Sequence, residues 1–148
     1  MNRRSTAAKQ AAPRVPAGFR PIPRLSPFNA LVGPLYARRP RGKPLVVGLR
    51  IDEKHLNSRG ICHGGVLATL ADLSLGYAMH AQAGGKGGFV TAHLDVDYVG
   101  AARAGDWIES RVDIQRIGTR LAFASCYLVA LERRIVRASA IFARAEGG

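Results

Sequence analysis

The sequence predicts an α+β fold, in which an antiparallel sheet packs against one long central helix. Residues 66–83 are apolar on every side of the helical repeat, and a helix of that kind must be enclosed by the rest of the protein. Residues 89–145 then read as four strands joined by short turns. With 148 residues, 47% of them hydrophobic, the chain has enough material for the core of one domain. One buried helix followed by a meander of strands is an α+β plan.

The first 24 residues are expected to form a basic, flexible tail in front of a domain that spans residues 25–148. The tail holds six positive charges and no acidic residue, with prolines among Ala and Ser. An organellar transit peptide and a nucleic-acid-binding tail are alternatives. Phe28 and Leu31 are expected to begin a short helix or loop over the core, and residues 44–51 to form an early strand.

The charge and the cysteines limit the partners and the compartment. A net charge of +12, from 22 Lys and Arg against 10 Asp and Glu, attracts polyanions such as nucleic acids, acidic membranes and phosphorylated cofactors. Cys62 and Cys126 are too few for a disulfide framework, and no apolar signal-peptide core follows the first residues, so a cytoplasmic location is expected. A buried, unreactive Cys62 is favoured over a thiol–imidazole pair with His63, because neighbouring side chains diverge.

The central helix carries the candidate chemistry. His63, Gly64 and Gly65 open it, where backbone N–H groups lack intrahelical partners and small residues let a substrate approach. Asp72 is its one charge, and an ionised carboxylate is costly to bury unless it is paired or used. A membrane-spanning helix is excluded, because residues 66–83 are at the short edge of a bilayer span and a central Asp would cost about 2.5 to 3.5 kcal/mol.

The strands that follow are read from their alternation. The glycine-rich stretch 84–88 is expected to be a linker, because the spacing of a phosphate-binding P-loop and its Ser or Thr are missing. Residues 89–99 alternate, so one face of that strand is predicted to be core and the other polar. The predicted core face holds Val90, Ala92, Leu94, Val96 and Tyr98, and the polar face Thr91, His93, Asp95 and Asp97. Later strands are predicted at 107–117, 121–131 and 134–145.

The motif Asn-x-x-Gly-x-x-His-Gly-Gly over residues 57–65, followed by Asp72 and Gly76, resembles a known family. It is similar to the hotdog-fold acyl-CoA thioesterases, in particular the PaaI-like group of phenylacetic acid degradation, and the likeness extends over residues 28–145. The resemblance implies a hotdog fold, in which an antiparallel sheet wraps around one long central helix. It also implies hydrolysis of an acyl-CoA, with an aromatic or medium-chain acyl group, to the free acid and CoA.

The resemblance implies roles for five residues. The Gly64 N–H would donate to the thioester carbonyl oxygen, as an oxyanion donor at the positive end of a helix. Asp72 would be the general base or the direct nucleophile, with a buried role at a dimer interface as the alternative. Asn57 and His63 would hold or polarise the thioester, the alternative for His63 being a helix-capping imidazole. Thr91 would orient the water or the carboxylate.

The same resemblance places contacts to the CoA nucleotide at Arg103, Arg116, Gly118 and Arg120. CoA is part of the substrate, so no separate cofactor is expected, and the histidines and cysteines show no spacing typical of metal ligands. A noncatalytic acyl-CoA-binding protein is the main alternative function. Nucleic-acid binding is disfavoured, because no recognition helix or aromatic platform accompanies the basic charge.

Helix geometry adds a prediction about assembly. Gly64 and Asp72 are eight residues apart, which on an α-helix is about 12 Å of rise with about 80° of rotation. One thioester carbon does not easily lie near both, so each Gly64 is expected to work with Asp72 of another copy of the chain. An isologous dimer with two equivalent sites follows. The family resemblance likewise implies a homodimer, or a homotetramer built from two dimers.

Overall fold

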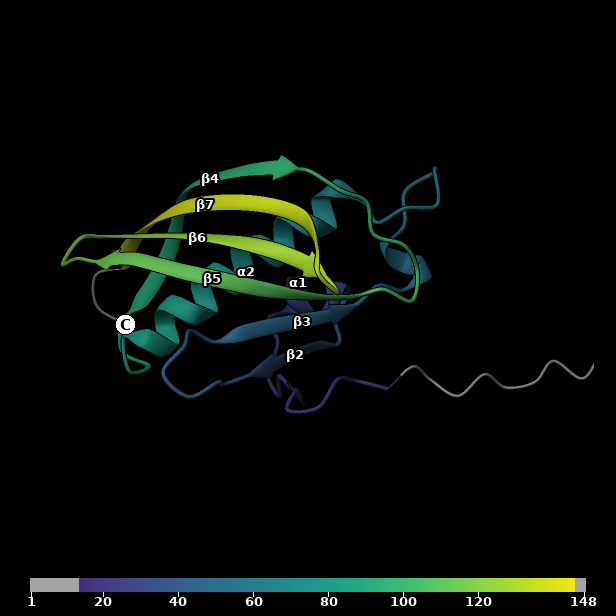
Figure 1. Cartoon of the computed structure of the whole chain (residues 1–148). Helices are drawn as coiled ribbons and strands as arrows, with labels where there is room; N and C mark the ends of the chain where they lie inside the picture. Colours follow the sequence, from purple (N-terminus) through teal and green to yellow (C-terminus); the bar gives the residue numbers. More distant parts are fainter. Residues whose placement is uncertain (1–13, 146–148) are drawn as a thin grey trace, which may run out of the picture.

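In a computed structural model, which describes residues 14–145, a seven-stranded antiparallel sheet curves around one long helix (Figure 1). The sheet order is β1-β2-β3-β5-β6-β7-β4. The strands are β1 (Arg20–Pro21), β2 (Leu35–Arg38), β3 (Val46–Arg50), β4 (Gly88–Tyr98), β5 (Trp107–Ile117), β6 (Leu121–Ala130) and β7 (Arg133–Ala145). The helices are α1 (Pro27–Val32), the 3-10 turn η1 (Glu53–His55) and α2 (Gly64–Gln82). This arrangement confirms the predicted α+β class and the hotdog architecture.

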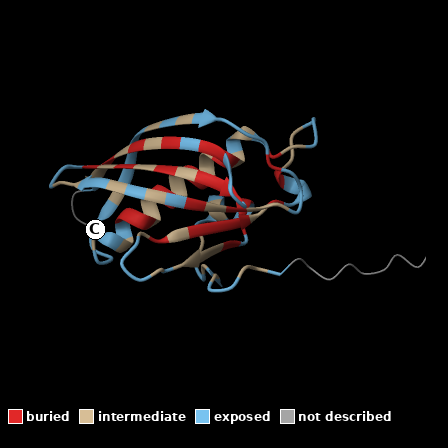
Figure 2. Ribbon diagram, viewed as in Figure 1, coloured by how far each residue is buried: buried red, intermediate tan, exposed pale blue. Residues whose placement is uncertain are grey.

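The core lies between the concave face of the sheet and α2. Buried positions alternate along β5, β6 and β7 (red in Figure 2), as a half-covered sheet requires. The helix contributes fully buried side chains on the facing side: Leu67, Leu70, Ala71, Leu75, Ala78 and Met79. None of the helices in residues 14–145 is both long and apolar enough to cross a membrane.

The prediction that α2 is enclosed on every side is wrong, because one side of the helix is left uncovered by the rest of the chain. Gly65 and His80 are exposed, and Thr69, Asp72 and Gly76 between them are only half-buried. Their spacing of three to four residues places all five on one side of the helix. A sheet covers only part of a helix's circumference, so this stripe remains uncovered within the chain.

The alternation predicted for β4 is confirmed from Leu94 onward but is wrong before it, because the strand contains a β-bulge. Thr91 pairs with Phe142 and His93 pairs with Ile141, which leaves Ala92 as an extra residue. Before the bulge, Phe89 and Thr91 face α2, and Val90 is 59% exposed. Beyond the bulge, Leu94 and Val96 face the core, so the bulge places Thr91 on the helix side.

The segment from residue 14 to residue 24, called here the N-terminal strap, is ordered rather than tail-like. β1 pairs with β2 at the outer edge of the sheet, and Ile22 packs against the core. The Phe19 ring packs edge-on against Trp107, with 5.0 Å between the ring centres, and the Arg38 guanidinium lies 5.1 Å from the centre of the Phe19 ring. The prediction of a flexible tail is therefore wrong for residues 14–24, which form the strap. Residues 1–13, the rest of the predicted tail, lie outside the described residues.

Candidate active site

The loop before α2 presents an open backbone donor. His63 is the N-cap of the helix, and its Nδ1 accepts a hydrogen bond from the Gly65 N–H at 2.9 Å. The imidazole therefore caps the helix, and its contact to the thioester stays a prediction. The Gly64 N–H has no intrahelical acceptor, and no hydrogen bond formed within residues 14–145 uses it. It points out of the positive end of the helix dipole, where an oxyanion would be stabilised.

Tyr98, at the end of β4, packs on the same helix end. Its hydroxyl donates to the Gly64 carbonyl at 3.0 Å. A Cβ placed on Gly64 would lie 3.3 Å from two carbons of the Tyr98 ring, so the missing side chain lets the ring approach the backbone. The sequence showed Tyr98 only as the last member of an alternating strand, and no motif linked it to the helix.

Asn57 organises the loop that leads into the helix. Its Oδ1 accepts hydrogen bonds from the N–H groups of Arg59 and Ile61, at 2.9 and 3.4 Å. Its own backbone N–H donates to the Ile61 carbonyl at 2.8 Å, closing a tight turn. The half-buried Asn57 side chain thus holds the shape of the loop, and a contact to the thioester stays a prediction.

Asp72 and Thr91 meet through a short hydrogen bond. The Thr91 hydroxyl donates to Asp72 Oδ1 at 2.7 Å, across the space between β4 and α2. The bulge in β4 makes this contact possible, because the uninterrupted alternation would have turned Thr91 away from the helix. One carboxylate oxygen is thereby fixed, and the carboxylate is oriented.

Two hollows open beside this pair. A cleft of about 350 Å³, called here the Asp72 cleft, lies toward the C-terminal half of α2, with Phe89 and Phe142 on its sheet side. A second hollow of about 330 Å³ lies on the other side, toward α1, with Phe28 and Leu94 in its lining. Asp72, Leu73 and Thr91 line both. The carboxylate therefore lies between two open spaces, one of which is largely aromatic.

One chain does not bring the predicted site residues together. Asn57, His63 and Gly64 lie at the N-terminal end of α2, and Asp72 and Thr91 lie at its middle. Gly64 and Asp72 are eight residues apart on the continuous helix, which separates them by about 12 Å along its axis. Within one chain the predicted site residues thus form two separate groups, one around the backbone N–H of Gly64 and one around the carboxylate of Asp72.

The residues predicted to contact CoA also divide between the two ends of the molecule (Figure 1). Arg103 lies in the loop before β5, next to Ala102, whose carbonyl accepts the Cys62 N–H beside the helix start. Arg116, Gly118 and Arg120 lie at the β5–β6 turn, at the opposite end of the sheet.

At that turn, the Gly118 N–H donates to the Leu121 carbonyl at 2.9 Å. Lys86, Arg120 and Arg144 surround an open hollow of about 650 Å³ beside it. The glycine-rich stretch interpreted as a linker therefore adds a cation, Lys86, to this end of the sheet.

Both cysteines are buried and weakly acidic. Burial raises the pKa of the Cys62 thiol to about 11 and that of Cys126 to about 12. Since a thiol reacts as its thiolate, these values agree with the predicted unreactive Cys62 and not with a thiol–imidazole pair.

The seven-stranded sheet around one long helix defines a hotdog protein. Residues 59–136 match the family model described as the Thioesterase superfamily, and the chain belongs to that superfamily.

Relatives in several organisms carry related names. A Pseudomonas aeruginosa protein, whose name assigns it provisionally to the esterases, is 47% identical over 128 residues, which cover 86% of this chain and 96% of that protein. Acyl-coenzyme A thioesterase 13 of Mus musculus is 34% identical over 82 residues, and the match covers 55% of this chain and 57% of the mouse protein.

Solved structures share the fold. The zebra fish thioesterase superfamily member 2 has a TM-score of 0.73 at 24% identity, with 81% of this chain and 88% of that chain covered. A mutant of the phenylacetic acid degradation protein PaaI from Thermus thermophilus has a TM-score of 0.71 at 24% identity, covering 81% and 100%. A hypothetical thioesterase protein from Streptococcus pneumoniae, solved with coenzyme A, has a TM-score of 0.68 at 20% identity, covering 75% and 88%.

Proposed function

We propose that the protein is an acyl-CoA thioesterase, which hydrolyses an acyl-CoA with an aromatic or medium-chain acyl group to the free acid and CoA. The observation that carries this proposal is the Thr91–Asp72 hydrogen bond at the mouth of an aromatic-walled cleft. A carboxylate oriented by a hydroxyl and open to a cleft is equipped to act on a thioester bound there.

The chemistry needs a base or nucleophile and an oxyanion donor. As a general base, Asp72 takes a proton from water while the water oxygen adds to the thioester carbon. As a nucleophile, its free oxygen adds to the same carbon and water later opens the anhydride. In both routes the C–S bond breaks and the CoA sulfur leaves with a proton. The Gly64 N–H donates to the carbonyl oxygen as negative charge develops on it.

An isologous dimer would complete the site. The uncovered stripe of α2 and the edge strand β4 form one continuous side of the chain, on which Val90 is 59% exposed. Two helices running antiparallel across a two-fold axis would bring each Gly64 toward the partner's carboxylate. The same rotation would bring Arg116 and Arg120 of one chain toward Arg103 of the other, so that arginines of both chains would bind the CoA phosphates. The coenzyme A held by the Streptococcus pneumoniae protein supports this substrate class.

Asp72→Asn tests the chemistry. The amide keeps the shape of the side chain and accepts from Thr91, but it neither takes a proton nor attacks a carbonyl. We expect kcat on acyl-CoA substrates to fall by at least about two orders of magnitude, with melting temperature and substrate binding unchanged. Release of CoA, followed with a thiol-trapping dye, measures the rate. Near-normal turnover would remove Asp72 from the mechanism, and tight acyl-CoA binding without turnover in the unmutated protein would favour a noncatalytic binder.

A further inference from the structure

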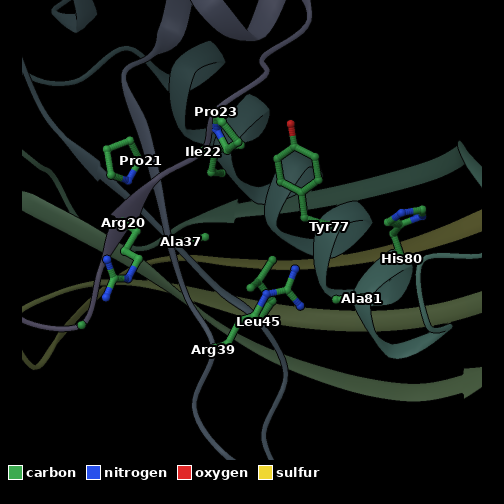
Figure 3. A pocket seen from close by; sticks show the side chains of 11 residues that line it. Arg20, Pro21, Ile22, Pro23, Ala37, Arg39, Leu45, Tyr77, His80 and Ala81 are labelled. Carbon is green, nitrogen blue, oxygen red and sulfur yellow. The ribbon is translucent and has the colours of Figure 1, made fainter.

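A further cavity, called here the strap cavity, lies over the C-terminal half of α2 and has a volume of about 480 Å³. The N-terminal strap forms one wall, the β2–β3 connection another, and the helix the third (Figure 3). Ile22, Ala37, Leu45 and Ala81 supply apolar surface. The volume and the apolar lining fall within the range of small-molecule sites.

The strap cavity borders the Asp72 cleft. Tyr77 and His80 line both spaces, so the two lie on either side of these residues. The Tyr77 hydroxyl accepts a hydrogen bond from Asn29 Nδ2 at 3.2 Å, which holds the ring between them. His80 is eight residues beyond Asp72 on the same helix, about 12 Å along its axis. An acyl group whose carbonyl lies beside Asp72 would have to pass Tyr77 and His80 to reach the strap cavity, and a chain of medium length would span this distance.

The rim of the strap cavity is cationic. Arg20 of β1 and Arg39, which follows β2, both line it (Figure 3). No acidic side chain is among the described residues of the lining, and neither guanidinium forms an ion pair within residues 14–145. The neighbouring Arg38, in contrast, pairs with Glu109 at 3.6 Å.

These observations rest on the proposed function and extend it to the substrate. We propose that the strap cavity receives the far end of a medium-chain acyl group that terminates in a carboxylate, so that the preferred substrate is the CoA monothioester of a dicarboxylic acid. The methylene chain packs on the apolar surface, and the terminal carboxylate pairs with Arg20 and Arg39. A methyl end at the same place would displace water from two guanidinium groups and return no hydrogen bond.

The test compares decanedioyl-CoA with decanoyl-CoA, which share chain length and differ in the terminal group. We expect the unmutated protein to have the higher kcat/KM for decanedioyl-CoA. Arg20→Ala with Arg39→Ala should raise KM for decanedioyl-CoA at least about tenfold, which corresponds to about 1.4 kcal/mol, because the terminal carboxylate loses both of its partners. KM for decanoyl-CoA should stay within about twofold, and kcat should be unchanged for both.

Arg24→Ala with Arg41→Ala is the matched control. It removes two exposed arginines from the same two segments, and neither lines the strap cavity. This control should leave both KM values unchanged. Inhibition by free CoA should be equal in all three proteins, because a weaker inhibition in the Arg20→Ala, Arg39→Ala protein would mean that these arginines meet the CoA phosphates instead.

Several outcomes overturn the proposal. Three results would show that the strap cavity does not bind a terminal carboxylate: equal effects on the two substrates, equal effects of the two double variants, or a preference for decanoyl-CoA. None of these results would argue against thioester hydrolysis itself. Failure of the unmutated protein to hydrolyse any acyl-CoA would instead overturn the proposed function, and this inference with it.

Discussion

The carboxylate of Asp72 takes its orientation from a hydroxyl on another element. Thr91 donates to Oδ1 at 2.7 Å, which leaves Oδ2 for a proton or a carbonyl carbon. The proposed oxyanion donor is the backbone N–H of Gly64, and His63 leaves it available by accepting from Gly65 instead of Gly64. The side chains of Thr91 and His63 therefore act by holding another group in position.

Thr91 gives the first prediction. Thr91→Val keeps the branched shape and removes the hydroxyl, so we expect kcat to fall about tenfold, the scale of one lost hydrogen bond. Thr91→Ser retains the donor and should keep kcat within about threefold. Steady-state kinetics on one acyl-CoA measures both variants. Equal activity of the Val and Ser proteins would show that the hydroxyl does not orient the carboxylate.

The buried thiols give a dependence of stability on pH. The pKa of Cys126 is raised from 9.0 to about 12 by burial, and that of Cys62 to about 11. Above pH 9 the unfolded chain loses these protons while the folded chain retains them, so the free energy of unfolding falls as the pH rises from 9 toward 11 and 12.

Urea unfolding from pH 8 to pH 11 measures this fall, with Cys126→Ala as the comparison. We expect the alanine variant to lose stability less steeply than the unmutated protein over this range. Parallel curves would show that this thiol does not contribute. Native protein at pH 8 should also react slowly with thiol reagents at both cysteines.

At the scale of the element, small departures from regularity place the functional groups. One extra residue in β4 moves Thr91 to the helix side. In β3, Gly48 allows Trp107 of β5 to lie against the strand, because a Cβ there would be 2.2 Å from the indole. The same indole supports Phe19 of the strap at 5.0 Å. The wall of the strap cavity thus depends on a glycine two strands away.

Gly48→Ala tests this chain of contacts. The added methyl group overlaps Trp107, and an overpacked site of this kind costs about 1–3 kcal/mol. A chain of this size loses about 2–4 °C of melting temperature per kcal/mol, which thermal unfolding measures. The double variant Gly48→Ala, Trp107→Leu relieves the overlap, so its loss should be smaller than the sum of the two single losses. Additive losses would mean that the indole moves aside freely.

At the scale of the whole molecule, the chain has two separate groups of predicted site residues and one uncovered side of α2. Much of this was predictable. The helix, the four later strands and the motif around Gly64 follow from periodicity and spacing, which are local properties. The bulge at Ala92 was not predictable from the sequence. An inserted residue reverses which face of the strand the side chains occupy, but the polar–apolar alternation in the sequence does not reveal it. The strap was missed because its basic, proline-rich composition hides the contact of Phe19 with Trp107, which is distant in sequence.

The proposed shared site predicts rescue between two inactive proteins. Gly64→Pro removes the N–H donor at a helix position that tolerates proline, and His63 before it already has the extended conformation that proline requires. Asp72→Asn removes the carboxylate. Each protein alone should be nearly inactive, and co-expression should restore activity, because one site of each mixed dimer combines an intact Gly64 with an intact Asp72.

Gly64→Ala is the control for this experiment. It introduces a Cβ at the same distance from Tyr98 but keeps the N–H, so a loss confined to the proline variant identifies the donor. Purified mixed dimers no more active than their parents would place the whole site within one chain.

The contact between the strap and Trp107 also gives the protein an intrinsic fluorescent probe of the strap's position. Trp107 is the chain's one tryptophan, so all indole emission comes from this position. Phe19 packs against the ring, and the Arg50 guanidinium lies 5.1 Å from its centre. If the strap lifts, the indole meets water and its fluorescence shifts to longer wavelength. Lifting of the strap can therefore be followed without any label, in the same cuvette that measures hydrolysis.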